Sequence, residues 1–126
     1  MYTCYELSEE LKASLIEKFP PKYSRVLCDH VTIEFGVTKT TCMPSDTTLE
    51  VIGYVDTGDG LECFLVRVND SIERPDGKYY HITHSLDPTK YKPVNSNTVL
   101  KEHVVNSTYI AFDDSVCGEG IGQLNY

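Results

Sequence analysis

Two short motifs of the same form lie about fifty residues apart and carry the side chains of this chain that are best suited to chemistry. HVTI at 30–33 and HITH at 81–84 both read H-x-T-x, and each follows residues that favour turns. In an extended strand residues i and i+2 share a face, so each motif presents one imidazole and one hydroxyl about 7 Å apart along the backbone. A single H-x-T is equally typical of an ordinary polar strand face, so the inference depends on both motifs.

Two imidazoles and two hydroxyls around one point are a set that phosphodiester cleavage can use. One of His30 and His81, in its neutral form, removes a proton from the attacking oxygen, and the other, protonated, donates a proton to the leaving oxygen. The hydroxyls of Thr32 and Thr83 can donate to the non-bridging phosphate oxygens. We therefore expect a reaction that needs no metal ion and no cofactor, and the sequence leaves open which histidine is the acid.

The second motif has neighbours that extend the candidate site. In a regular strand Ser85 shares the face of His81 and Thr83 and is a third candidate phosphate ligand, although a serine at a strand end is as often structural. His84 falls on the opposite face, where we expect a buried or solvated histidine that takes no part in catalysis.

Aromatic and basic side chains supply candidate contacts to a nucleotide. Lys90, Tyr91 and Lys92 follow the second motif and bring positive charge and a stacking surface, although a solvated loop explains them equally well. Tyr5 is one of nine tyrosines that are candidates for stacking on a base.

Composition limits the partners of the protein. The chain has 126 residues, which suits one domain over 1–126, and its formal net charge of −8 argues against binding of long duplex nucleic acid. A small anionic ligand held by a few local donors remains compatible with that charge. Five scattered cysteines without a CxxC pair and the lack of a long apolar run indicate a reduced, soluble, cytoplasmic protein without a membrane segment.

Periodicity places both motifs on strands. We expect strands over 2–7, 26–37, 49–55, 61–68 and 107–112, a helix after Ser8 that stops at Pro20, and a short helix over 96–104. The second motif lies in a further strand that begins after the turn RPDG at 74–77. The state of the glycine-rich tail from Cys117 is left open. Strands without a repeated βαβ order predict an α+β fold with a mostly antiparallel sheet.

The paired H-x-T-x motifs resemble those of the 2H phosphoesterase superfamily, of the LigT and cyclic phosphodiesterase type. The segments CDHVTIEFG, LEVIGYV and YYHITHSLDPTKYKPVNSN are similar to the phage branch of Swiss Army Knife RNA repair-like proteins, and the resemblance covers residues 25 to 112. It implies a bilobed, pseudo-twofold sandwich of two sheets with a central cleft. Within that cleft the resemblance implies that His30 and His81 are the acid and base pair and that Thr32 and Thr83 bind phosphate.

The same branch resembles the anti-CBASS phosphodiesterases, which destroy cyclic oligonucleotide signals of bacterial defence. This implies a metal-independent phosphodiesterase acting on small cyclic nucleotides, in the host cytoplasm if a phage encodes it. Two alternatives stay open. One is an enzyme of RNA end repair that opens 2',3'-cyclic phosphates, and the other is a module that binds and sequesters nucleotides without cleaving them.

Overall fold

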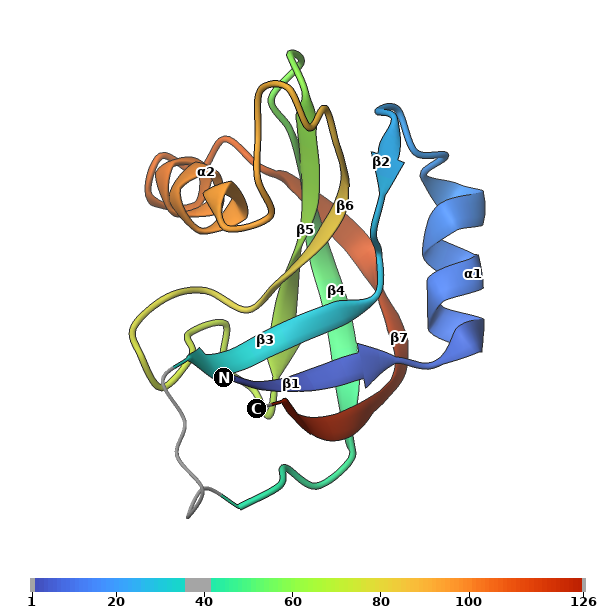
Figure 1. Ribbon diagram of the computed structural model, residues 1–126, viewed down its shortest axis with the longest axis vertical. Helices are drawn as coiled ribbons and strands as arrows, with labels where there is room; N and C mark the ends of the chain where they lie inside the picture. The colour runs from blue at the N-terminus through green and yellow to red at the C-terminus, as the bar shows by residue number, and fades with distance from the viewer. Residues whose placement is uncertain (1, 36–41, 126) are drawn as a thin grey trace.

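The computed structural model describes residues 2–35 and 42–125, which form a curved sheet flanked by two helices (Figure 1). Along the chain the elements are β1 (Tyr2–Leu7), α1 (Glu9–Lys18), β2 (Arg25–Val26), β3 (His30–Phe35), β4 (Thr47–Asp56), β5 (Leu61–Val68), β6 (His81–Leu86), α2 (Asn95–Val105) and β7 (Ile110–Asn125). Every pairing between these strands in the described part of the chain is antiparallel. The expected α+β class with an antiparallel sheet is confirmed.

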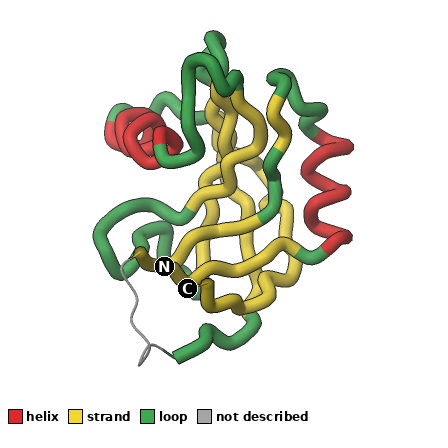
Figure 2. Tube along the Cα trace, in the orientation of Figure 1, coloured by secondary structure: helices red, strands yellow, loops and turns green. Residues whose placement is uncertain are grey.

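The strands form one sheet where we expected two. Their order is β2-β6-β5-β4-β7-β1-β3, and the yellow strand segments in Figure 2 run through the middle of the molecule between the two helices. The halves stay joined because β7, with 16 residues, pairs with β4 along its first part and with β1 along its last. A register shift between Val51 and Gly53 of β4 interrupts the ladder with β7, and such irregularities let a sheet bend.

The strand expected over 26–37 is divided into β2 and β3. Cys28, between them, has a φ of 51°, a left-handed conformation that turns the chain away from its extended course. As a result β2 pairs with β6 near one end of the sheet order, whereas β3 pairs with β1 at the other end. The last two residues of the expected strand, 36 and 37, lie outside the described residues.

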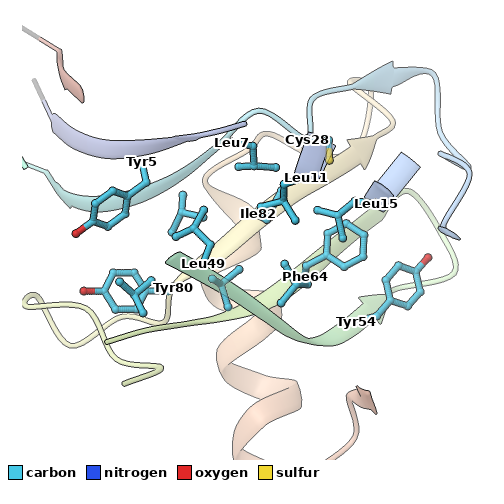
Figure 3. Packing of buried hydrophobic residues seen from close by; sticks show 14 residues of the cluster. Tyr5, Leu7, Leu11, Leu15, Cys28, Leu49, Tyr54, Phe64, Tyr80 and Ile82 are labelled. Atoms are coloured by element: carbon cyan, nitrogen blue, oxygen red, sulfur yellow. The ribbon is translucent and has the colours of Figure 1, made fainter. Parts of the chain in front are cut away.

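Both faces of the sheet are covered by hydrophobic residues. Leu11 and Leu15 of α1 pack in one buried cluster with Phe64 of β5, as Figure 3 shows, while Leu65 on the other face of β5 packs with Leu100 of α2. A strand covered on both faces becomes apolar at nearly every position, which accounts for the run LECFLVRV.

The glycine-rich tail belongs to β7. A Cβ atom built on Gly118 would lie 2.5 Å from the Cβ of Leu11, and one on Gly120 would lie 2.8 Å from the Cγ of Leu49. These glycines therefore permit close packing of α1 and β4 against the strand. The expected cap of α1 is confirmed, since the Ser8 hydroxyl accepts from the Leu11 amide at 3.2 Å.

Candidate active site

A pocket of about 230 Å³ lies between the two motif strands and the start of α2. Its lining combines both motifs with polar and apolar neighbours: Leu27, Asp29, His30, Thr32, Arg74, His81, Thr83, Pro93, Val94 and Asn97. The structure thus brings together the two histidines and two threonines singled out from the sequence.

The left-handed turn at Cys28 explains how two strands far apart in the sheet order share one pocket. Before this turn the chain runs beside β6, where the amides of Leu27 and Cys28 donate to the carbonyls of His84 and Thr83, both at 2.9 Å. Two residues later His30 opens β3, and β3 and β6 contact each other across the pocket. The first motif is therefore anchored beside the second by backbone hydrogen bonds.

His81 is a buried, neutral imidazole. Its Nδ1 lies 3.0 Å from the carbonyl oxygen of Tyr79, and because a carbonyl only accepts, Nδ1 carries the hydrogen and the lone pair is on Nε2. The pKa of His81 is lowered from 6.5 to about 4, chiefly because burial removes water from the charged ring. The positive charges of Arg74 and His30 act in the same direction, and the hydrogen bond to Tyr79 opposes them.

His30 has a different environment. Its side chain is 32% exposed, and its Nδ1 lies 2.7 Å from Oδ1 of Asp29, which also lines the pocket. The hydrogen bond from His30 is the main reason that the pKa of Asp29 lies below its usual value, so this carboxyl is ionised at neutral pH. Because a carboxylate oxygen only accepts, Nδ1 of His30 carries the hydrogen, and Nε2 is the ring nitrogen left for another partner.

The two threonines line the pocket next to their histidines. Thr32 is nearly buried, whereas Thr83 is partly exposed, and its Oγ1 lies 2.8 Å from Oγ of the fully buried Ser96 in α2. When Ser96 donates this hydrogen bond, the hydroxyl hydrogen of Thr83 is left for another acceptor. Ser96 was not singled out from the sequence, because only the packing of α2 brings it to β6.

Arg74 and Asp29 are the charged lining residues that sequence reasoning missed. Arg74 is the one Arg or Lys among the residues that line the pocket, and it comes from the turn RPDG, which the sequence marked only as a reversal. Asp29 directly precedes the first motif, so its position beside His30 was the one available signal.

Ser85 does not lie in the pocket, which corrects our expectation. Its fully buried hydroxyl donates to Oε1 of Glu62 at 2.7 Å and accepts from the amide of Tyr23 at 3.3 Å. The cause is a register shift in the pairing of β5 with β6: Cys63 faces Thr83 and Glu62 faces Ser85, so His84 is the extra residue of a bulge. A bulge re-aims the side chains that follow it, and Ser85 consequently leaves the face of Thr83.

His84 is buried, which is one of the two environments expected for it. Its Nε2 lies 2.6 Å from the carbonyl oxygen of Phe19 and 3.6 Å from Oε1 of Glu62, and its ring packs on Phe64. These contacts belong to the core between α1 and the sheet.

The four candidate nucleotide contacts do not line the pocket either. Tyr5 is buried in the core cluster that also holds Leu7 and Tyr80, because β1 turns this side chain inward. Tyr91 donates to Asp59 at 2.8 Å in the DTGDG turn, and Lys90 and Lys92 are exposed on the same loop. The loop reaches the pocket only at Pro93 and Val94, whose side chains are apolar.

The described residues contain neither a cluster that could bind a metal ion nor a helix that could span a membrane. No group of three or more His, Cys, Asp or Glu side chains in residues 2–35 and 42–125 is placed to hold a metal ion. In the same residues there is no helix with the length and apolar character needed to cross a membrane.

Comparison with known proteins gives one structural likeness to report. No family model matches the chain, and no curated protein matches its sequence. The fold is similar to that of a fungal RNA kinase of known crystal structure, with a TM-score of 0.60 and 16% sequence identity over 98% of this chain. The chain corresponds to 41% of the kinase chain, so the match covers less than half of that protein. At this identity the likeness shows a shared fold.

Proposed function

We propose that this protein is a 2H-type phosphodiesterase that cleaves small cyclic nucleotides without a metal ion. The observation that carries the proposal is that two H-x-T motifs on separate strands line one pocket and that each histidine has its Nδ1 held by an acceptor. In both rings Nε2 is then the atom left for proton transfer, which is the arrangement that general acid and base catalysis needs.

The two environments favour different roles for the histidines in this proposal. His81 is neutral above about pH 4 and has its lone pair on Nε2, so it is the general base. Nδ1 of His30 is held by the ionised Asp29, and with His81 as the base, Nε2 of His30 is left to act as the general acid. Titratable groups whose environments differ in this way can divide acid and base work at one pH.

The proposed step balances protons without an external group. Nε2 of His81 takes the proton of the attacking hydroxyl while the new P–O bond forms, and Nε2–H of His30 gives its proton to the leaving oxygen while the old P–O bond breaks. With a 3',5' linkage the substrate's own 2'-hydroxyl can attack, which leaves a 2',3'-cyclic phosphate; otherwise water attacks. Hydroxyls of Thr32 and Thr83 stabilise the charge on the non-bridging oxygens.

The size and polarity of the pocket favour a small substrate. A cavity of about 230 Å³ takes a phosphodiester and part of its nucleoside, not a duplex. Leu27, Pro93 and Val94 provide an apolar wall for a sugar or base. Together with the net charge of −8, this favours cyclic di- or trinucleotide signals of the anti-CBASS type.

A second candidate is the opening of 2',3'-cyclic phosphates at RNA ends. It is favoured by the likeness in fold to a fungal RNA kinase, a protein that acts on RNA by its name. A binding module that sequesters nucleotides is the third alternative, but binding alone gives no reason to hold two imidazoles with Nε2 directed to proton transfer.

A substrate panel tests the proposal. We expect the protein, in excess EDTA, to cleave at least one of 3',3'-cGAMP, a cyclic trinucleotide or a 2',3'-cyclic mononucleotide. His30→Ala and His81→Ala should each lower kcat by about a hundredfold or more, because each removes one proton-transfer group. Intact ligand retained at one equivalent would indicate a binding module, and activity lost in EDTA would contradict the metal-free mechanism.

A further inference from the structure

Arg74 is a buried cation in the wall of the candidate active site. Its side chain has no exposed surface, although the protein as a whole carries a net charge of −8. Burying a guanidinium costs free energy unless several acceptors hold it, so a buried arginine beside a pocket calls for an explanation.

Within the part of the chain that the structure describes, three directed hydrogen bonds hold this guanidinium. Nε donates to the carbonyl oxygen of Ile33 at 3.1 Å, Nη1 donates to Oδ1 of Asn97 at 3.3 Å, and Nη2 donates to Oδ2 of Asp76 at 2.7 Å. The three acceptors belong to β3, α2 and the turn before β6. A planar, five-donor fork can satisfy such a set, whereas a lysine ammonium cannot reproduce its geometry.

Two of the three acceptors are sequence neighbours of residues at the motif threonines: one follows a motif threonine, and the other follows the serine that contacts the second threonine. Ile33 directly follows Thr32 in β3. Asn97 directly follows Ser96, whose hydroxyl lies 2.8 Å from that of Thr83.

The third contact leads to His81. The amide of Arg74 donates to the carbonyl of Lys78 at 2.7 Å, which closes the turn that contains Asp76. The next residue, Tyr79, provides the carbonyl that holds Nδ1 of His81. Arg74 is thus connected to the groups that orient His81, Thr83 and Thr32.

The sheet itself does not fix the spacing of the two motifs, because β3 and β6 are not hydrogen-bonded neighbours. Backbone hydrogen bonds join the two segments at Leu27 and Cys28, before β3 begins. At Ile33, the last residue of the first motif, the hydrogen bond from Arg74 connects β3 to the segment that leads into β6.

We propose that Arg74 is a positioning residue of this site: it fixes the separation of the two H-x-T motifs and places a positive charge behind the phosphate. This inference rests on the proposed phosphodiesterase function. Since the guanidinium is fully buried, it acts through the groups that it holds and through its field, without touching the substrate. A small displacement of acid and base groups is enough to lower a rate by orders of magnitude.

The test compares Arg74→Lys, which keeps the charge and loses the fork, with Arg74→Met, which loses both. Arg67→Lys and Arg67→Met are the matched controls, since Arg67 also pairs with a carboxylate, Glu50 at 2.6 Å, and does not line the pocket. Thermal unfolding of all four variants measures the purely structural effect.

Kinetics give the first measurement. We expect Arg74→Lys to lower kcat by about tenfold or more while KM changes by less than about threefold, because geometry is lost and charge is kept. Arg74→Met should show the same loss of kcat together with a higher KM, because the charge is also lost. The Arg67 variants should behave as the wild type.

Imidazole NMR gives a measurement that does not depend on turnover. The charges facing His81 are Arg74 and Lys78 from the turn and His30, with its partner Asp29, from the other motif. Removing the positive charge in Arg74→Met should raise the pKa of His81, whereas Arg74→Lys should leave that pKa close to the wild-type value.

Several results would overturn the proposal. Wild-type kcat in Arg74→Lys would exclude a role for the fork, and an unchanged pKa of His81 in Arg74→Met would exclude a role for the charge. If Arg74→Met does not fold, Asn97→Leu removes one acceptor and must still lower kcat. If the wild type cleaves no substrate of the panel, the proposed function fails by itself, and the pKa of His81 in the variants still decides whether Arg74 acts on this site.

Discussion

At the scale of single residues, the two histidines differ because the protein surrounds them differently. His81 is 8% exposed and bonded to a backbone carbonyl, so its neutral form is favoured, while His30 is more exposed and bonded to a carboxylate. The same residue type in the same motif thereby acquires opposite roles in the proposed reaction.

The pH dependence of catalysis should report this difference. We expect kcat/KM to fall on the acid side only near pH 4, because His81 must be neutral to act as base and its pKa is about 4. For kcat the acid limb should lie at higher pH, because the negative phosphate of the bound substrate favours the protonated ring. Initial rates measured from pH 3.5 to 9 at several substrate concentrations give the acid limb of kcat/KM and the acid limb of kcat.

Asp29→Asn provides the companion measurement for His30. Without the carboxylate the hydrogen bond that holds Nδ1 of His30 is weaker, so kcat should fall while the acid limb, which belongs to His81, stays in place. A shift of the acid limb in this variant would reverse the assignment of acid and base.

At the scale of elements, the bulge in β6 decides which side chains enter the pocket. It leaves Thr83 in the pocket and directs Ser85 to a buried group formed by Glu62, Tyr54 and the amide of Lys22. The Tyr54 hydroxyl donates to Glu62 at 2.5 Å, and burial, followed by this hydrogen bond, raises the pKa of Tyr54. The first half of the strand therefore lines the pocket, and its second half belongs to the buried interior.

Ser85→Ala tests this division of β6. We expect the free energy of unfolding to fall by about 1 to 3 kcal/mol, because a buried carboxylate loses a hydrogen-bond donor. Substrate affinity and kcat should not change, since Ser85 does not line the pocket. Urea unfolding and steady-state kinetics measure the two effects, and Ser71→Ala, at an exposed serine, is the control. A selective rise in KM would instead support the phosphate contact expected from the sequence.

At the scale of the whole molecule, the buried neutral His81, the proposed general base, makes the stability of the fold depend on pH. The folded protein binds a proton at His81 with a pKa of about 4, whereas the ordinary value is 6.5, so below about pH 6.5 the unfolded chain binds the proton more readily. Stability is therefore lost as the pH falls from 6.5 to 4, and the loss ends once the folded state is also protonated.

His81→Gln should make unfolding less dependent on pH. From the two pKa values we expect the wild type to lose up to about 3 kcal/mol more than the variant between pH 7 and pH 4. Urea unfolding of both proteins at several pH values gives the difference directly, and contributions from carboxylates such as Asp56 cancel in it. Parallel pH dependences of the two proteins would show that His81 is not buried as a neutral ring.

The sequence alone determined the class of the fold and four of the pocket residues. Alternation within β3 and β6 places His30 with Thr32 and His81 with Thr83, and this pattern is local, because side chains alternate along any strand segment that no bulge interrupts. The cap at Ser8 and the β-rich pattern are local in the same sense.

The tertiary structure decided the remaining features. The left-handed turn at Cys28, the bulge at His84 and the pairing of the glycine-rich tail all depend on partners far away in the chain. Arg74 reaches the site only because Ile33, Asn97 and Asp76 converge on it. Local patterns fix which face a side chain occupies where the strand is regular, as at the two motifs. The meeting of two faces depends on long-range packing, and it is this packing that turns two separate motifs into one pocket.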